Sequence, residues 1–280
     1  MVFRGGARLA ALLLAFASAA GRADDTPPLV VTIEAPRDIA QWTAAGSGSR
    51  IDAADIARTR PAHASELFAR VPDVWVSRGD GQESLIAIRS PVLTGPGACG
   101  AFQILEDGIP IRPAGFCNVN ELFEVDFAQA AAVEVARGPA SSQYGANALH
   151  GAINIVSHRP GPQPWSFGVE AGPDDTATGR VSAGSPHWRL DAQGMDTNGF
   201  RDAAPVGEQK LGLAHATDLG RWQVTSRLAA SNLNQETAGF IVGKNAYRKA
   251  GLRRDNVNPE AYRDASSARA SSAWRTVLGE

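Results

Sequence analysis

The stretch Glu134–Ser157 constrains the fold more than any other part of the chain, because strand-like runs alternate in it with closely spaced glycines. A short apolar run enters the stretch, and Gly138, followed by proline, interrupts that run, since glycine admits a positive φ and proline fixes φ. Gly145 and Gly151 then bracket a compact loop. A β-branched strand follows, with one polar residue, Asn154, at its centre. The stretch therefore predicts two strands joined by a tight loop.

This stretch resembles the end of the plug domain of TonB-dependent outer-membrane receptors, whose pattern is close to E-V-x-R-G-P-x-S-x-x-Y-G-x-x-A-x-x-G-x-I-N-I. The residues of this chain that fill the pattern are Glu134, Val135, Arg137, Gly138, Pro139, Ser141, Tyr144, Gly145, Ala148, Gly151, Ile153, Asn154 and Ile155. So many fixed residue types at fixed offsets rarely coincide; a generic glycine-rich strand-loop-strand is the alternative. The resemblance implies an α+β plug domain followed by the first strands of an antiparallel transmembrane β-barrel, which this chain leaves incomplete.

Residues 1–23 have the three parts of a secretory signal peptide. Arg4 and Arg8 precede an apolar run, and small residues follow that run. The apolar run is too short for a membrane anchor. We expect cleavage after Ala23, with Ala19 as the second choice, and hence an exported protein. The family resemblance implies that its destination is the outer membrane of a Gram-negative cell.

Residues 24–50 are expected to form a flexible tail, which is polar and contains proline and glycine. Within it lies a short β-prone run made of Leu29, Val30, Val31, Thr32 and Ile33. An extended apolar segment of this kind can add itself to the edge of another protein's sheet. The run resembles the family's TonB box, by which TonB, the energy-coupling protein of the inner membrane, grips the receptor. A plain linker is the alternative interpretation.

The plug domain is expected over residues 51–157. Short helical pieces precede strands over 74–76 and 85–89, and Asp73 stands where the family usually has glycine, which puts the shape of that turn in doubt. A strand over 102–106 is followed by the hairpin turn Asp107-Gly108 and a returning strand. A short helix is expected within 120–132.

The chain has two cysteines, Cys99 and Cys117. If the Asp107-Gly108 turn sets the register of its hairpin, the two cysteines face each other within one residue at the open end. An exported protein is expected to oxidise such a pair to a disulfide, which stabilises by roughly 3 kcal/mol in the chain-entropy model. Metal binding, for which no histidine lies nearby, and free thiols are the alternatives. Most plug domains lack this pair.

From Trp165 onward the pattern changes to a period of two, which indicates strands with one apolar and one polar face. Residues 165–280 are predicted to hold about six strands, over 165–171, 178–184, 187–195, 208–216, 221–231 and 267–278. Their connections are expected to run longer, very short, long, very short and very long. Alternating short and long connections are typical of a transmembrane β-barrel, although a soluble sandwich also alternates its faces. Tryptophans suit the membrane interface or, nearly as well, core packing; they are Trp165, Trp188, Trp222 and Trp274.

The number of strands is too small for a closed barrel. A barrel that holds a plug needs around 22 strands, judged from known barrel sizes. Six strands would leave lipid-exposed edges with unpaired backbone groups, which a membrane does not tolerate. We therefore expect a fragment, a truncated gene or a frameshift product of a larger receptor.

Composition and motifs exclude several classes of function. The net charge is −2, and the chain shows no basic patch of the kind that nucleic acid requires. The five histidines lack metal-ligand spacing, and no nucleophile elbow, P-loop or Cys-x-x-Cys motif is present. We therefore expect no enzyme activity, no catalytic residue, no metal site and no cofactor.

The resemblance implies energised uptake of a scarce nutrient, such as a ferric siderophore or cobalamin. Its expected partners are TonB, the small-molecule nutrient or metal chelate, and outer-membrane lipid. The plug residues expected to contact the ligand are Arg78, Gln82, Arg112, Phe116 and Asn118. Glu134 and Arg137 are expected to make ion pairs that hold the plug in the barrel. The alternatives are a periplasmic plug-type module that does not transport and a secreted β-rich hydrolase, for which no catalytic triad is visible.

Overall fold

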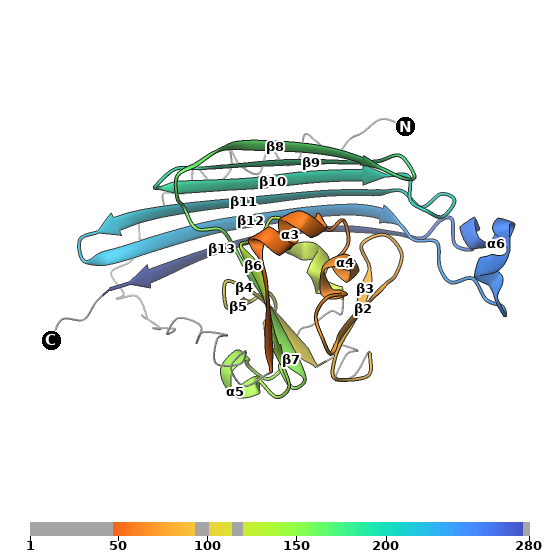
Figure 1. The fold of residues 1–280 in the computed structure, drawn as a ribbon, viewed down its shortest axis with the longest axis horizontal. Helices are drawn as coiled ribbons and strands as arrows, with labels where there is room; N and C mark the ends of the chain where they lie inside the picture. Colours follow the sequence, from red (N-terminus) through yellow and green to blue (C-terminus); the bar gives the residue numbers. More distant parts are fainter. Residues whose placement is uncertain (1–46, 93–100, 114–119, 277–280) are drawn as a thin grey trace, which may run out of the picture. The chain divides into compact units, whose positions relative to one another are not determined.

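The computed structural model describes residues 47–92, 101–113 and 120–276, all of which belong to one compact unit (Figure 1). The signal peptide, the Leu29–Ile33 segment, both cysteines, Phe116 and Asn118 lie outside these described residues. The predictions made for them therefore stay predictions. Among the described residues, no helix is both long and apolar enough to cross a membrane.

The first part of the chain forms a small mixed sheet with short helices around it. The sheet has the strand order β1-β6-β7-β4-β5, in which β4 and β7 are parallel and the other neighbours antiparallel. Its strands are β1 (Gly48–Asp52), β4 (Phe102–Glu106), β5 (Ile109–Pro110), β6 (Ala132–Arg137) and β7 (Gly151–Val156). A separate hairpin pairs β2 (Val74–Arg78) with β3 (Ser84–Ile88). The helices are α3 (Ala53–Thr59), α4 (Ala64–Phe68), the 3-10 helix η2 (Glu121–Glu124) and α5 (Ser141–Tyr144).

The stretch that opened the sequence argument folds as β6, α5 and β7. Gly151 begins β7 where the backbone leaves no room for a side chain, since an added Cβ would lie 2.3 Å from the carbonyl oxygen of Ala136. Asn154 is buried at the centre of β7. Its amide donates to Glu134 Oε2 at 3.0 Å, and its Oδ1 accepts from the Gly108 amide at 2.8 Å. This one polar residue therefore ties the Asp107-Gly108 turn to the middle of the sheet.

The largest apolar cluster of the described residues fills this domain, which we call the plug. Side chains that are almost completely buried come from α3 and α4 as well as from the sheet: Ile56, Leu67, Phe68, Ile86, Ile88, Ile104, Leu122, Ile153 and Ile155. The helices are too short to be stable alone, so burial of these side chains against the sheet is what holds them.

Two local features of the plug bear on the sequence predictions, the turn at Asp73 and the segment 120–132. Asp73 keeps the left-handed backbone that glycine usually supplies, with φ of 62°, and its carboxylate accepts from Arg89 Nε and Nη2 at 2.9 and 2.8 Å. The short helix expected within 120–132 forms as the four-residue 3-10 helix η2, and the rest of the segment is not helical. Leu122, Val125 and Phe127 pack into the plug core, whereas Phe123 packs into a second apolar cluster. The backbone is extended at Val125, directly after η2.

The second part of the chain is one antiparallel sheet in which each strand pairs with its neighbour in sequence. Its strands are β8 (Gln163–Gly172), β9 (Thr176–Gly184), β10 (Trp188–Thr197), β11 (Val206–Leu219), β12 (Trp222–Glu236) and β13 (Tyr262–Arg275). The sheet is open at β8 and β13 and runs beside the plug (Figure 1). The predicted fold class, an α+β plug followed by antiparallel strands that do not close, is confirmed.

The connections between these strands alternate as expected, with one exception. Those at 185–187 and 220–221 are tight turns at one end of the sheet, whereas 198–205 and 237–261 are longer loops at the other end. The first connection, predicted to be longer, is only 173–175. The prediction was wrong there because β8 and β9 extend beyond the residues that alternate in polarity. They meet at a tight turn, in which the Thr176 amide donates to the Pro173 carbonyl at 3.1 Å.

Candidate functional site: the charged contact between plug and sheet

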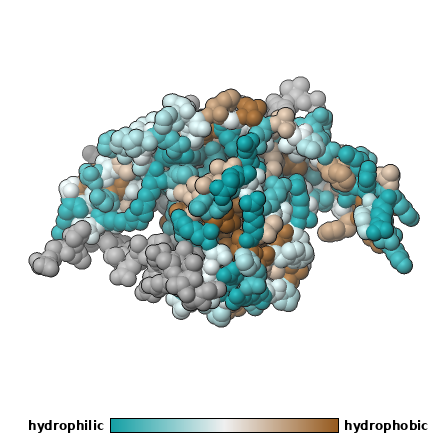
Figure 2. Space-filling model, in the orientation of Figure 1, coloured by the Kyte–Doolittle hydropathy of each residue, from teal (hydrophilic) through white to brown (hydrophobic). Residues whose placement is uncertain are grey.

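The six-stranded sheet has one apolar and one charged face, and the charged face is the buried one. The register places Leu190, Leu213 and Leu228 in one row across three strands. The pairing of β10 with β9 and of β9 with β8 places Phe167 on the same face, where it is 75% exposed. Lys210, on the opposite face, is 4% exposed. Figure 2 shows hydrophobic surface along β8. The sheet of a soluble protein buries its apolar face, whereas this sheet exposes its apolar face and buries its charged face.

Each face has a consistent composition across the strands. The exposed apolar face carries Trp165, Phe167, Val169, Val181, Trp188, Leu190, Ala192, Leu211, Leu213, Leu228, Ala230, Ala268, Ala270 and Trp274. The face turned to the plug carries Arg180, Arg189, Asp191, Glu208, Lys210, Arg227, Arg263 and Arg269. An apolar outer face with a polar inner face is the arrangement of strands in a transmembrane barrel.

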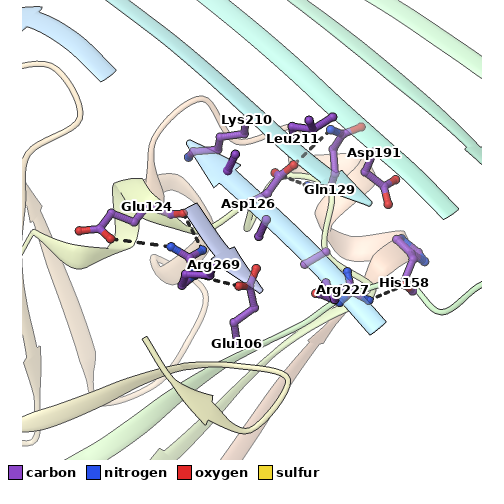
Figure 3. A pocket seen from close by; sticks show the side chains of 15 residues that line it. Glu106, Glu124, Asp126, Gln129, His158, Asp191, Lys210, Leu211, Arg227 and Arg269 are labelled. Atoms are coloured by element: carbon purple, nitrogen blue, oxygen red, sulfur yellow. Dashed lines mark hydrogen bonds and ion pairs between the residues drawn. The ribbon is translucent and has the colours of Figure 1, made fainter. Parts of the chain in front are cut away.

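Arg269 of β13 reaches two elements of the plug at once (Figure 3). Its Nε lies 3.1 Å from Glu106 Oε2 at the end of β4, and its Nη2 donates to the Glu124 carbonyl at 2.9 Å. Its Nη1 lies 3.7 Å from Glu124 Oε2, and Glu124 also pairs with Arg112. Burial raises the pKa of the Glu124 carboxyl, and the two arginines oppose that rise.

Arg227 of β12 holds the hairpin turn of the plug. Its Nε lies 2.9 Å from Asp107 Oδ2, and its Nη2 donates to the His158 carbonyl at 2.8 Å. Asp107 also accepts the Ser157 amide at 2.8 Å, so one carboxylate joins the turn, the end of β7 and the sheet. The sequence predicted Asp107-Gly108 only as a turn. In the structure this turn is also a point at which the plug binds the sheet.

A further group of charges lies near these two arginines, beside a small cavity that Asp126 and Lys210 line (Figure 3). Lys210 Nζ lies 2.9 Å from Glu208 Oε1 and 4.9 Å from the centre of the Phe127 ring. Asp126 faces this cavity and accepts the Gln129 amide at 3.0 Å. Burial raises the pKa of the Asp126 carboxyl, which Lys210 opposes. Buried charges of this kind are stable only while their partners stay in place.

A second contact joins the far end of the plug to the long-loop end of the sheet. The Gln82 amide donates to Gln235 Oε1 at 2.9 Å, and the Gly239 amide donates to Asp80 Oδ2 at 3.1 Å. Arg263 lies 2.7 Å from Glu83. An apolar cluster lies next to these bonds and consists of Phe123, Met195, Val206 and Leu233.

The expected ligand residues that are described do not gather at one point. Arg78 is exposed and lies 3.7 Å from Glu66. Gln82 is buried against the sheet, and its side-chain amide donates to the Ala62 carbonyl at 3.0 Å. Arg112 pairs with Glu124 instead.

The contacts described below for Glu134 and Arg137, the pair expected to hold the plug in the barrel, lie within the plug. Glu134 pairs with Arg50 and accepts from Asn154. Arg137 donates to Ser49 Oγ, the Pro72 carbonyl and the Gly48 carbonyl at 2.9, 3.0 and 3.0 Å. Among the described residues, the charged side chains seen to join plug and sheet include Arg227, Arg263 and Arg269, which the sequence analysis did not single out. The available signal was the period-two alternation, which places Arg227 and Arg269 on the polar face of β12 and β13.

All four tryptophans of the sheet lie at the end that carries the tight turns. Trp165, Trp188 and Trp222 stand near the start of β8, β10 and β12, and Trp274 stands near the end of β13. Trp222 and Trp274 meet edge to face, with ring centroids 6.4 Å apart. Trp165 and Trp274 are 70% and 56% exposed, so core packing does not explain them.

Comparison with known families and structures agrees with this geometry. Residues 40–152 match the family model of the TonB-dependent receptor plug domain. The chain is similar in structure to the ferric citrate transporter FecA in its unliganded form, with 18% identity and a TM-score of 0.67 over 83% of this chain and 37% of that one. It is similarly close to FpvA of P. aeruginosa bound to heterologous pyoverdines, with 17% identity and a TM-score of 0.67 over 83% of this chain and 32% of that one.

A third similar structure is the ferric-catecholate import receptor Fiu from E. coli K12 in its open form. The identity is 18% and the TM-score 0.60, over 83% of this chain and 36% of that one. At these identities the likeness concerns the fold. The chain spans about a third of the length of the structures that it matches.

Proposed function

Because the chain carries the plug domain of a TonB-dependent receptor, we propose that it acts in the outer membrane in the energised uptake of a scarce nutrient, such as a ferric siderophore or cobalamin. The observation that carries this proposal is the inverted sheet, whose apolar face is exposed and whose charged face holds the plug. A lipid environment makes such a sheet favourable, because lipid removes the cost of exposed Phe167 and Leu213. Receptors of this family are transporters rather than enzymes.

In this proposal the plug is held firmly and released by force. Removing one partner of a buried ion pair costs about 3–5 kcal/mol, although the intact pair contributes little net stability. The pairs of Arg227 with Asp107 and of Arg269 with Glu106 and Glu124 are largely but not fully buried, so the lower end of this range applies to them. They fit a plug that stays closed at rest and rearranges when TonB pulls on the tail.

In this proposal, TonB acts on the tail that precedes the plug. We propose that residues 1–23 direct export, that Leu29–Ile33 pair as a strand with TonB, and that the plug extends over 51–157. Energised transport then depends on Leu29–Ile33, while binding of the nutrient at the cell surface does not.

Deletion of Leu29–Ile33 tests this function. Cells that carry the deletion should bind the nutrient at the surface as well as before but lose uptake, and uptake by the unaltered chain should cease when the inner-membrane gradient is collapsed. A deletion of equal length at 35–39, in the same tail and outside the residues that match the plug domain, is the matched control and should leave uptake unchanged. Uptake that survives the deletion of 29–33 contradicts the proposal.

A second candidate function is a periplasmic plug-type interaction module that does not transport. The six-stranded sheet favours it in one respect, since its edges at β8 and β13 are open. Fractionation separates the two functions, because a membrane-inserted receptor resists salt extraction from outer membranes and a periplasmic module does not.

A further inference from the structure

The exposed face of the six-stranded sheet carries hydrogen-bonded polar side chains near its long-loop end. Asn232 of β12 donates through Nδ2 to Gln209 Oε1 of β11 and to Asn234 Oδ1, both at 2.8 Å. Asn234 Nδ2 donates in turn to Asp264 Oδ1 of β13 at 2.9 Å. Gln209 is paired with Asn232 in the strand register, and Asn234 with Asp264. These four side chains from three neighbouring strands therefore form one continuous strip, which we call the amide strip.

The amide strip stands where the apolar belt of a membrane strand ends. Trp222 precedes Asn232 by ten residues on β12, and Trp274 follows Asp264 by ten residues on β13. Ten residues span about 33 Å along a strand, or about 25 Å across the membrane at a tilt of about 40°. The apolar band of a transmembrane barrel is also about 25 Å tall. If the tryptophans mark one membrane interface, the amide strip marks the other and meets lipid headgroups rather than acyl chains.

The described strand positions around the amide strip carry acidic side chains and none that is basic. Asp196 of β10 stands in the same row as Asp264, and Glu236 stands at the next outward-facing position of β12 beyond Asn234. A phosphate group would meet these like charges without gaining an ion pair from the strip. The strip therefore favours a headgroup that hydrogen-bonds without a negative charge.

Some polar atoms of the amide strip have no partner within the part of the chain that the structure describes. No hydrogen bond among those residues involves Gln209 Nε2, Asn232 Oδ1 or Asp264 Oδ2. The first atom is a donor and the other two are acceptors, which suits a hydroxyl group because it both donates and accepts. Tyr262, two residues before Asp264, is 70% exposed and offers a ring to the apolar side of a sugar.

We propose that the amide strip binds the sugar headgroup of a glycolipid, with Gln209, Asn232, Asn234 and Asp264 hydrogen-bonded to its hydroxyl groups. The inference rests on the outer-membrane location that is part of the proposed function, and it goes beyond uptake. The strip then recognises one kind of headgroup, whereas the tryptophans at the other end need only an interface between water and an apolar phase. A second copy of this chain, meeting the first strip to strip, is an occupant that the test must separate from the lipid.

Binding of two lipids to the full chain in detergent micelles tests the proposal. The probes are monogalactosyl diacylglycerol, whose headgroup is an uncharged sugar, and phosphatidylglycerol with the same acyl chains, whose headgroup is an anionic phosphate. Each is titrated, and native mass spectrometry counts the bound lipids. The unaltered chain should bind the galactolipid ~3–10-fold more tightly, which corresponds to one or two net hydrogen bonds. The variant N232A/N234A should lose most of this galactolipid affinity and bind the two lipids within ~2-fold of each other.

The matched control is S226A/S272A. Ser226 and Ser272 stand on the same face of the same two strands and share a cross-strand hydrogen bond at 3.0 Å, but they lie nearer the tight turns. This variant should keep the preference of the unaltered chain. If the two variants change the preference equally, the polar face as a whole acts on the lipid and the site is wrong.

Three further outcomes overturn the proposal. The first is equal affinity of the unaltered chain for both lipids. The second is a gain of phosphatidylglycerol affinity in N232A/N234A with galactolipid affinity unchanged, because the strip then only repels phosphate. The third is a two-chain mass that N232A/N234A abolishes, which assigns the strip to a second copy. Lipid binding is measured without transport, so selective galactolipid binding by a chain that takes up no nutrient would contradict the proposed uptake alone.

Discussion

Arg269 on the last strand of the sheet and Glu106 at the end of strand β4 of the plug meet with Nε and Oε2 3.1 Å apart, across 163 residues of sequence. The same guanidinium lies 3.7 Å from Glu124 Oε2. Replacement of Arg269 by Met keeps the aliphatic stem and removes the charge, which leaves two partly or fully buried carboxylates with less compensation. We expect R269M to lower the free energy of unfolding of the plug by about 3 kcal/mol, measured by urea titration.

R275M is the control for this change, because Arg275 lies six residues further along β13 and is exposed. It should shift the unfolding free energy by less than ~0.5 kcal/mol. The double variant E106Q/R269M should recover part of the loss, since a neutral amide then replaces the Glu106 carboxylate and no unpaired charge is buried at that position. A double variant as unstable as the sum of the two single variants would show that the pair is not coupled.

Gly81 lies so close to the sheet that an added side chain would have to displace Gln235 or Val206. Its φ is +55°, and an added Cβ would lie 2.6 Å from Gln235 Oε1 and 2.9 Å from Val206 Cγ2. Gly220 has φ of +59° with nothing within 4 Å, so G220A carries the backbone strain without the clash. We expect G81A to cost ~1–3 kcal/mol more than G220A in urea titration.

The contact between Gly81 and Gln235 can be tested further with Q235A, which removes the nearest atom. In the double variant G81A/Q235A the excess cost should fall. G81A should also raise protease cleavage in the loop 237–261, and the double variant should lower it again. An excess that is the same with and without Gln235 would mean that the clash lies elsewhere.

Local patterns predicted the elements of this fold, but not the contacts between its two parts. The strands after Trp165 were predictable because period-two alternation reports the face of each side chain, and the Asp107-Gly108 turn because its residues tolerate a positive φ. Alternation does not say which charged side chain lies within 3 Å of which plug residue. Glu134 and Arg137 drew attention because they stand in the plug motif, yet the observed partners of the plug are Arg227, Arg263 and Arg269, which stand in no motif. In the segment around η2 the pattern predicted a short helix, but it did not show that the buried side chains belong to two different clusters.

Leu213 tests whether the exposed face meets lipid. It is 41% exposed and lies in register with Leu190 and Leu228. L213R should cost about 2–4 kcal/mol in urea titration of the chain in phospholipid bilayers, because an arginine on the lipid face near the midplane is unfavourable. Q209R, on the same face but among the polar residues nearer the long-loop end, should cost at most ~1 kcal/mol. Equal costs for the two variants would contradict a lipid-facing sheet.

His63 is fully buried at the start of α4 and makes the plug sensitive to acid. Its Nδ1 accepts the Ser65 amide at 3.1 Å, and its Nε2 lies 3.1 Å from the Glu83 carbonyl, so the neutral ring fits both partners. Burial, aided by the positive charge of Arg78, lowers the pKa of His63 from 6.5 to about 4. The unfolded chain therefore binds this proton first. The stability that the neutral ring contributes is fully present above pH 6.5 and is lost as the pH falls, up to roughly 3 kcal/mol below pH 4.

H63Q should remove this part of the pH dependence, so its free energy of unfolding should fall less than that of the unaltered chain between pH 6.5 and pH 4. The exposed His187 gives the control H187Q, whose slope should match the unaltered chain. The raised pKa values of the Glu124 and Asp126 carboxyls act in the opposite direction, because the folded state takes up those protons first, but they are common to all three proteins and cancel in the comparison. Parallel pH profiles for H63Q and the unaltered chain would show that His63 is not the group that titrates.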